Sequence, residues 1–230
     1  METHAVKVIA RIQSDFPEKF GIPRQSGLVP ALRAKIVFEP EFRNDDALRG
    51  IEGFSHLWLI WQFSAAVRDT WSPTVRPPRL GGNERVGVFA TRSPFRPNAI
   101  GLSCVRLECA EREEGLGTVL IVSGADLMDG TPIYDIKPYL PYADAHPEAL
   151  GGFAPSPKET VMVDCPPELL AGLPEGQREA LLGVLAQDPR PQYQHDPERV
   201  YGMSFGGRDV KFRVRGDTLE VLSLAESKQE

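Results

Sequence analysis

Short runs of alternating apolar and polar residues dominate the first half of the chain and predict strands. Residues 6–12 alternate in this way, which is typical of a half-buried strand. Runs rich in branched and aromatic residues predict further strands at 35–39, 54–63, 85–91, 100–108 and 118–123. Asn44-Asp45-Asp46 could cap a short helical turn that Gly50 ends. No ten-residue helical period separates these strands, so we expect an antiparallel sheet or barrel rather than a doubly wound parallel sheet.

The pattern changes near residue 143. Prolines and paired glycines between 147 and 157 are typical of a linker. Beyond it, helices are predicted at 167–173 and 175–186, and strands at 203–205, 209–214 and 218–224. The sequence therefore predicts a mainly β protein with two domains. An antiparallel β-barrel catalytic domain would occupy residues 1–145, and a small α+β carboxy-terminal domain residues 158–226.

Composition narrows the class of protein. The 230 residues carry a net charge of −6, and 41% are hydrophobic, which is ordinary for a globular domain. No run approaches the roughly 20 apolar residues of a membrane span, and residues 1–11 lack a signal-peptide pattern. Three cysteines and four scattered histidines show no zinc-ligand spacing. We therefore expect a cytoplasmic protein with no membrane association and no metal site.

A basic, proline-rich stretch between residues 71 and 101 contrasts with this acidic balance. It holds five arginines and one acid, Glu84. The arginines are Arg76, Arg79, Arg85, Arg92 and Arg96. Arginine on a stiff loop suits bidentate contact with phosphate or carboxylate. We interpret this stretch as a surface for phosphate or an RNA backbone, although the arginines could instead pair with the chain's own surplus acids.

Two further polar clusters are candidates. Residues 126–142 follow a predicted strand and combine three carboxylates, one lysine and three tyrosines, which could grip ribose hydroxyls or an ammonium and stack on a base. Asx-turns would explain the same residues structurally. At the end of the second predicted helix, Arg190 and Tyr193 stand on a proline-stiffened turn with Asp188. The turn could contact nucleic acid, or its proline could simply end the helix, and the sequence favours neither interpretation.

Longer motifs run through these same segments. They are KFGIPRQ at 19–25, GFSHLW at 53–58, PTVRPPRLGGN at 73–83, GVFATRS at 87–93, FRPN at 95–98, DGTP at 129–132, DIKPYLP at 135–141 and QDPRP at 187–191. In this order they resemble the TsaA-like family, also called TrmO, across nearly the whole chain. Ser26 and Ala99 depart from it, since many relatives have proline there.

The resemblance implies an activity and a site. Members are S-adenosylmethionine-dependent tRNA methyltransferases with a β-barrel catalytic domain, and they methylate the exocyclic nitrogen of N(6)-threonylcarbamoyladenosine at position 37, beside the anticodon. The implied partner is the tRNA anticodon loop, and the implied assembly is a homodimer. Positions matching the family's cofactor contacts are Arg24, Gln25, Ser26, Gln62, Phe63, Arg92, Leu102, Pro132, Ile133, Tyr134 and Asp135. Asp135 is the candidate catalytic residue.

The RNA-contacting positions are expected among the basic and aromatic residues already described. They are Arg76, Arg79, Arg96, Asp188, Arg190 and Tyr193. The expected chemistry is direct methyl transfer, without a metal or a covalent enzyme intermediate. Two alternatives of other classes stay open on the residues alone. One is a non-catalytic RNA-binding β-barrel module, and the other is a phosphohydrolase that uses the same arginines.

Overall fold

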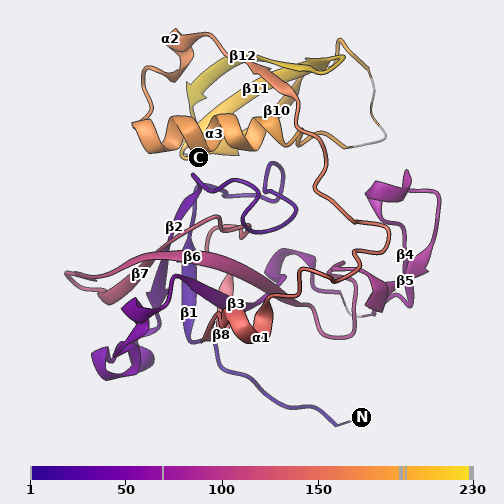
Figure 1. The fold of residues 1–230 in the computed structure, drawn as a ribbon. Coiled ribbons are helices and arrows are strands. Elements are labelled where there is room, and N and C mark those ends of the chain that lie inside the picture. Colours follow the sequence, from indigo (N-terminus) through magenta and orange to yellow (C-terminus); the bar gives the residue numbers. More distant parts are fainter. Residues whose placement is uncertain (1, 69, 192–193, 195, 228–230) are drawn as a thin grey trace.

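The structure is a computed structural model that describes residues 2–68, 70–191, 194 and 196–227. Figure 1 shows two layered units, with the first half of the chain below and the carboxy-terminal sheet above it. Each unit has a hydrophobic core. None of the helices in the described ranges has the length and apolar character needed to cross a bilayer.

Six antiparallel strands form the first unit. They are β1 (Ala10–Gln13), β2 (Arg33–Phe38), β3 (His56–Gln62), β6 (Ile100–Glu113), β7 (Gly117–Ser123) and β8 (Pro132–Pro138). Their order is β1-β2-β7-β6-β3-β8, and β8 pairs back to β1 through Ala10 and Ile133, which closes the sheet as a barrel. The closure leaves none of these six strands as a free edge.

The strand alternation in the sequence sets the core of this barrel. In β3 the side chains of Leu57, Leu59 and Trp61 are buried, and the residues between them are only partly buried. This is the period of two expected for a strand with one face on a core. The predicted strand at 54–63 is confirmed, as are those at 35–39, 100–108 and 118–123 to within a few residues, except that β6 runs on to Glu113.

Other predictions were wrong in position or extent. The first strand begins at Ala10 rather than residue 6. The strand predicted at 85–91 shrinks to β5 (Val86–Gly87), followed by the 3-10 turn η6 (Val88–Ala90). β8 was not predicted, because Pro132 and Pro138 suggested a loop. These prolines lie at the two ends of the strand, where a missing N–H is tolerated.

The connections are rich in short 3-10 turns. Between β2 and β3 lie η1 (Pro40–Phe42), η2 (Asp45–Leu48) and η3 (Ile51–Gly53). The predicted cap is confirmed, since the Asn44 side chain accepts a hydrogen bond from the Asp46 N–H at 3.0 Å. Between β3 and β6 lie η4 (Ser64–Ala66), β4 (Thr74–Val75), η5 (Pro78–Leu80), β5 and η6. β4 and β5 pair as a small hairpin that projects from the barrel (Figure 1).

A short helix, α1 (Pro141–Asp144), precedes the linker and the second unit. That unit contains β9 (Met162–Asp164), α2 (Pro167–Leu170), α3 (Glu175–Ala186), β10 (Tyr201–Phe205), β11 (Arg208–Arg215) and β12 (Thr218–Glu226). Its sheet order is β10-β11-β12-β9, with β9 parallel to β12. The predicted helices and three of the four strands are confirmed, whereas β9 was not predicted.

Residues from the start of the chain complete the core of the second unit. Phe16, Val29 and Leu32 are buried with Leu181, Phe205 and other side chains of the carboxy-terminal sheet and α3. The Phe16 and Phe205 rings meet edge to face, with centroids 5.4 Å apart. Helix α3 lies on the sheet face nearer the barrel (Figure 1), and Gly183 of this helix lies against the Val29 side chain. The two units therefore share apolar packing.

Asp15, a carboxyl group where the two units pack together, makes the free energy of unfolding depend on pH. Asp15 accepts a hydrogen bond from Gln177 Nε2 at 3.0 Å, and its carbonyl accepts one from the Gly206 N–H. Burial raises the pKa of Asp15, and the bond from Gln177 lowers it by less. Since the folded pKa lies above the unfolded one, ionisation costs folding free energy. That cost is absent below about pH 3.9 and grows as the pH rises through the folded value.

We expect Asp15→Asn to raise the free energy of unfolding at pH 7, because asparagine stays neutral and its Oδ1 can still accept from Gln177. The gain should shrink toward pH 4. Urea unfolding at both pH values measures it, with Asp217→Asn in an exposed turn as the control. A variant that is less stable than wild type at pH 7 would show that the charged form is the stabilising one.

Candidate active site

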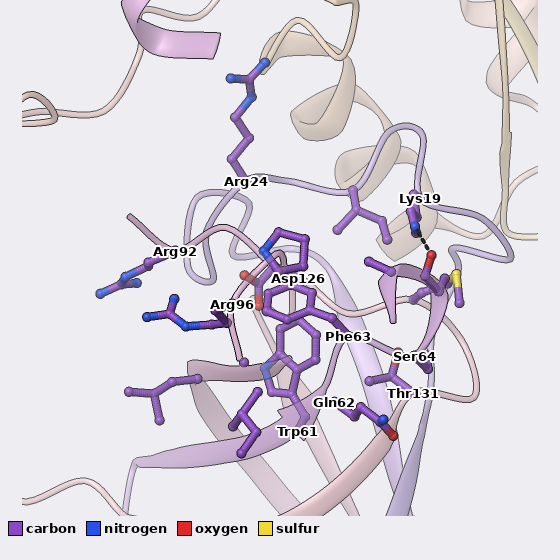
Figure 2. Close-up of a pocket in the computed structure, with 18 of the residues that line it drawn as sticks. Lys19, Arg24, Trp61, Gln62, Phe63, Ser64, Arg92, Arg96, Asp126 and Thr131 are labelled. Carbon is purple, nitrogen blue, oxygen red and sulfur yellow. Dashed lines mark hydrogen bonds between the residues drawn. The ribbon is translucent and has the colours of Figure 1, made fainter. Parts of the chain in front are cut away.

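A cavity of about 740 Å³ lies where four segments of the first unit meet. These segments are the loop after β1, the end of β3 with η4, the loop that leads into β6, and the loop between β7 and β8 (Figure 2). Its volume lies within the roughly 300–1,000 Å³ typical of small-molecule sites. Aromatic and aliphatic side chains form much of its wall, among them Trp61, Phe63, Phe95 and Leu102.

Trp61 shapes the floor of this cavity. It stands opposite Gly101 in the β3–β6 register, and a Cβ on Gly101 would overlap the atoms of the indole ring. The ring can therefore lie close to the β6 backbone only because residue 101 is glycine. The indole ring also packs against Phe63, with ring centroids 4.3 Å apart. This packing fixes where the indole N–H points.

The indole N–H begins a short hydrogen-bonded chain. Trp61 Nε1 donates to Ser103 Oγ at 3.0 Å, and Ser103 Oγ donates to Asp126 Oδ1 at 2.6 Å. Burial raises the pKa of Asp126, while hydrogen bonds from Ser103 and from backbone N–H groups, and the charge of Arg92, act in the opposite direction. Asp126 is the single acidic side chain among the described residues that line the cavity, beside the cations Lys19, Arg24, Arg92 and Arg96.

The structure brings six of the eleven expected cofactor residues to this cavity. They are Arg24, Gln25, Gln62, Phe63, Arg92 and Leu102. The Arg92 guanidinium donates to the Gln25 side chain, which links two of the four segments. Ser26 adjoins this set, and its Oγ accepts the Cys104 N–H at 3.1 Å.

The other four expected cofactor residues do not line the cavity. Pro132, Ile133, Tyr134 and Asp135 belong to β8, which runs between β1 and β3. Asp135 Oδ1 accepts the Ile136 N–H at 2.9 Å, and Oδ2 pairs with Lys137 Nζ at 2.8 Å. From the same part of the chain, it is Asp126, Met128 and Thr131 that reach the cavity.

Sequence reasoning missed Asp126 and Trp61 as site residues. Asp126 lay in the acidic cluster at 126–142, but among its three carboxylates the resemblance pointed to Asp135. Trp61 occupied an apolar strand, where a buried core role was the natural interpretation. Only the pairing of β3 with β6 shows that its indole nitrogen serves the cavity.

The basic stretch is an exposed surface beside the cavity. Arg76 and Arg79 are exposed on and next to the β4–β5 hairpin, and Arg79 donates to the Ser156 carbonyl of the linker. Arg96 lines the cavity and donates to the Thr91 carbonyl at 3.0 Å. The same basic stretch contains an exposed aromatic pair, Trp71 and Phe89, whose ring centroids lie 6.1 Å apart.

The third expected cluster has an internal structural role. Asp188 is buried, with a positive φ of 51°, and pairs with both Lys158 Nζ and Arg190 Nε at 2.9 Å. These bonds join the end of α3 to Lys158, while the expected contact of Asp188 and Arg190 with RNA stays a prediction. Tyr193 lies outside the described residues.

Comparison with known proteins agrees with this architecture. Residues 11–145 match the model of the tRNA-methyltransferase O N-terminal domain, and residues 159–227 match the TrmO C-terminal domain. The chain is 41% identical to the Escherichia coli K12 tRNA (adenine(37)-N6)-methyltransferase, over 97% of this chain and 99% of that protein. A Pseudomonas aeruginosa protein, RcsF, assigned by inference as an S-adenosylmethionine-dependent methyltransferase, is 46% identical over 97% of this chain and 98% of its own length.

A solved structure shows the same fold. The crystal structure of TrmO from Pseudomonas aeruginosa superimposes with a TM-score of 0.80 and 38% identity, covering 97% of this chain and 99% of that one. The chain belongs to the tRNA-methyltransferase O family, which confirms the resemblance drawn from the motifs.

The contact between Trp61 and Gly101 can be tested directly. We expect Gly101→Ala to lower the free energy of unfolding by about 1–3 kcal/mol, because the added methyl overlaps a side chain in a packed core. Tryptophan fluorescence should change as the ring is displaced. Gly87→Ala on the exposed hairpin, where a Cβ meets nothing within 4 Å, is the matched control. Equal stability of the two variants would contradict the close approach.

Proposed function

We propose that this chain methylates the exocyclic nitrogen of N(6)-threonylcarbamoyladenosine at position 37 of tRNA. The chain is an S-adenosylmethionine-dependent methyltransferase, as its family and its near full-length relatives establish. The observation that carries the proposal is the cavity. Residues of the motifs at 19–25, 87–93 and 95–98 line it, together with several aromatic side chains and one carboxylate, Asp126. The Escherichia coli relative, named for the N6 position of adenine 37, supports the choice of target atom.

The residues of the cavity fit the methyl donor. S-adenosylmethionine, when bound, supplies an electrophilic methyl group on a positively charged sulfur. Trp61, Phe63 and Phe95 offer apolar surface for an adenine ring. Arg24 and Arg92 are cations of the lining that can bind the amino-acid carboxylate. We propose Gln25, Ser26, Gln62 and Leu102 as supporting contacts, and assign Pro132 to Asp135 to holding the wall through β8.

The work left to the chain is positioning and exclusion of water. The accepting nitrogen is part of a carbamoyl group, so its lone pair is delocalised and it is a weak nucleophile. The aromatic side chains of the cavity wall exclude water and hold the accepting nitrogen in line with the methyl carbon, about 3 Å away. Removal of the N–H proton must accompany bond formation. The transfer proposed is direct, without a metal or a covalent enzyme intermediate.

The exposed surface around the cavity suits a larger partner. We propose that Arg76, Arg79 and Arg96 face the phosphates of the anticodon loop, which lies beside the target base. Four exposed apolar side chains, Trp71, Phe89, Ile100 and Leu102, support a homodimer in which a second copy covers them. Sedimentation velocity at micromolar protein distinguishes that dimer from a monomer.

The substrate assignment is tested with two tRNA samples that differ only in the threonylcarbamoyl group. Incubation with S-adenosylmethionine followed by mass analysis of nucleosides should show one added methyl on threonylcarbamoyladenosine, and none on unmodified adenosine 37. Methylation of unmodified adenosine at an equal rate would contradict the proposed substrate. Donor binding by calorimetry without any transfer to tRNA would favour the non-catalytic RNA-binding alternative.

The RNA surface predicts a salt effect. Arg76→Ala should reduce the slope of log affinity for tRNA against log salt by about one unit, because one phosphate contact is lost. Donor affinity should not change, since Arg76 lies outside the cavity. Arg49→Ala, on a different loop and paired with Asp46, is the matched control. An unchanged slope in Arg76→Ala would remove this arginine from the RNA surface.

A further inference from the structure

The proposed reaction releases a proton, and the cavity contains one group suited to receive it. The nitrogen must lose its hydrogen as the new N–C bond forms, so a proton acceptor is required within hydrogen-bond reach. Lysine and arginine side chains are donors and cannot serve while charged. Among the described lining residues, Asp126 is the one carboxylate. This inference rests on the proposed function and concerns the residue that acts at its chemical step.

The hydrogen bonds of Asp126 have a fixed direction. An indole N–H can only donate, so Ser103 Oγ accepts from Trp61 and directs its own hydrogen to Asp126 Oδ1. The chain holds Oδ1 as an acceptor and orients the carboxyl plane. No side chain of the described part of the protein donates to Oδ2. Ser103 thus holds Oδ1, the backbone N–H groups of Ser26 and Asp126 also act on the carboxylate, and no described side chain occupies Oδ2.

The surrounding cations do not neutralise this carboxylate. Lys19 Nζ donates to the Ala65 carbonyl, Arg92 to the Gln25 side chain and Arg96 to the Thr91 carbonyl. Arg24 points away from the cavity floor in Figure 2. Asp126 has no ion pair with any described residue, although Arg92 acts on it through space. An unpaired, partly desolvated carboxylate is a stronger base than one in a salt bridge.

We propose that Asp126 is the catalytic base of methyl transfer and that Trp61 and Ser103 position it. The nitrogen forms its bond to the methyl carbon as the carbon–sulfur bond breaks, and that bonding pair stays on sulfur. The N–H proton passes to Asp126 Oδ2, and its bonding pair returns to nitrogen. The neutral carboxyl group then loses the proton to water, which restores the starting state.

The sign of the pH dependence follows from burial. Burial raises the pKa of Asp126, so the carboxyl stays protonated to a higher pH than a free aspartate. The transfer rate should be low where the group is protonated and should rise as the pH passes its pKa. The other charged groups that line the cavity are Lys19, Arg24, Arg92 and Arg96.

The decisive variant is Asp126→Asn, because its Oδ1 can still accept from Ser103 while Oδ2 becomes a non-basic NH₂ group. We expect donor affinity by calorimetry to stay within about threefold, and the single-turnover rate to fall by about 10²-fold or more. The melting temperature of the ligand-free protein should match or exceed that of wild type, since a partly buried charge is removed. Asp129→Asn on the same loop, outside the cavity and bonded to the Ser14 N–H, is the matched control with wild-type rate.

Two results would overturn the proposal. A tenfold loss of donor affinity with a wild-type rate at saturating donor would make Asp126 a donor-binding residue instead. A lower melting temperature with a wild-type rate would make it a structural one. Both require that wild type methylates threonylcarbamoyladenosine, and failure of wild type to do so contradicts the proposed function itself.

The positioning role has its own measurement. Ser103→Ala removes a hydrogen bond to the charged carboxylate, so the pKa of Asp126 should rise. The acid limb of the rate profile should move to higher pH, and the carboxyl carbon of Asp126, followed by NMR in the ligand-free protein, should titrate at higher pH as well. An unchanged titration in Ser103→Ala would reject the hydrogen-bonded chain as the means by which Asp126 is held and tuned.

Discussion

The close packing of Trp61 against the backbone of Gly101 is the constraint on which the cavity depends. The β3–β6 register places Gly101 opposite Trp61 and Ser103 opposite Leu59, so the indole ring lies over one residue and its nitrogen reaches the next inward position. Larger side chains at 101 have no room there. The same contact therefore fills the end of the barrel, forms the cavity floor and orients the carboxylate of Asp126.

The two units are less independent than their separate sheets suggest. Phe16, Val29 and Leu32 follow β1 in the chain yet are buried with the carboxy-terminal sheet and α3. The segment that carries these residues also supplies Lys19, Arg24 and Gln25 to the cavity. Packing of the second unit on this segment thus supports one wall of the site, even though none of the described lining residues comes from beyond position 131.

Charge is distributed unevenly over the molecule. The chain has a net charge of −6, yet the cavity lining combines four cations with one acid. Prolines around these arginines limit backbone freedom, so the positive charges are held near the cavity rather than spread by motion. A negative overall charge and a basic site are compatible because salt screens exposed charges beyond about 10 Å.

Local signals in the sequence determined much of the fold. Strand alternation located β3, β6 and β7, the Asn44 side chain identified a capped turn, and apolar spacing located α3. The motifs also pointed to six residues that line the cavity. These features depend on neighbouring residues, whose spacing is visible in the chain itself.

Only the tertiary structure decided which polar residues face the cavity. The partners of the Trp61–Ser103–Asp126 chain are separated by 42 and 23 residues, so no local pattern could connect them. Asp188 is buried and pairs with the partly exposed Lys158, which lies 30 residues away, so no local pattern showed this ion pair either. The sequence by itself located most of the longer strands, although not β8 or β9, and it showed which motifs resemble those of the family. The choice among several carboxylates was made by strand register and burial, because these bring together groups that the chain keeps far apart.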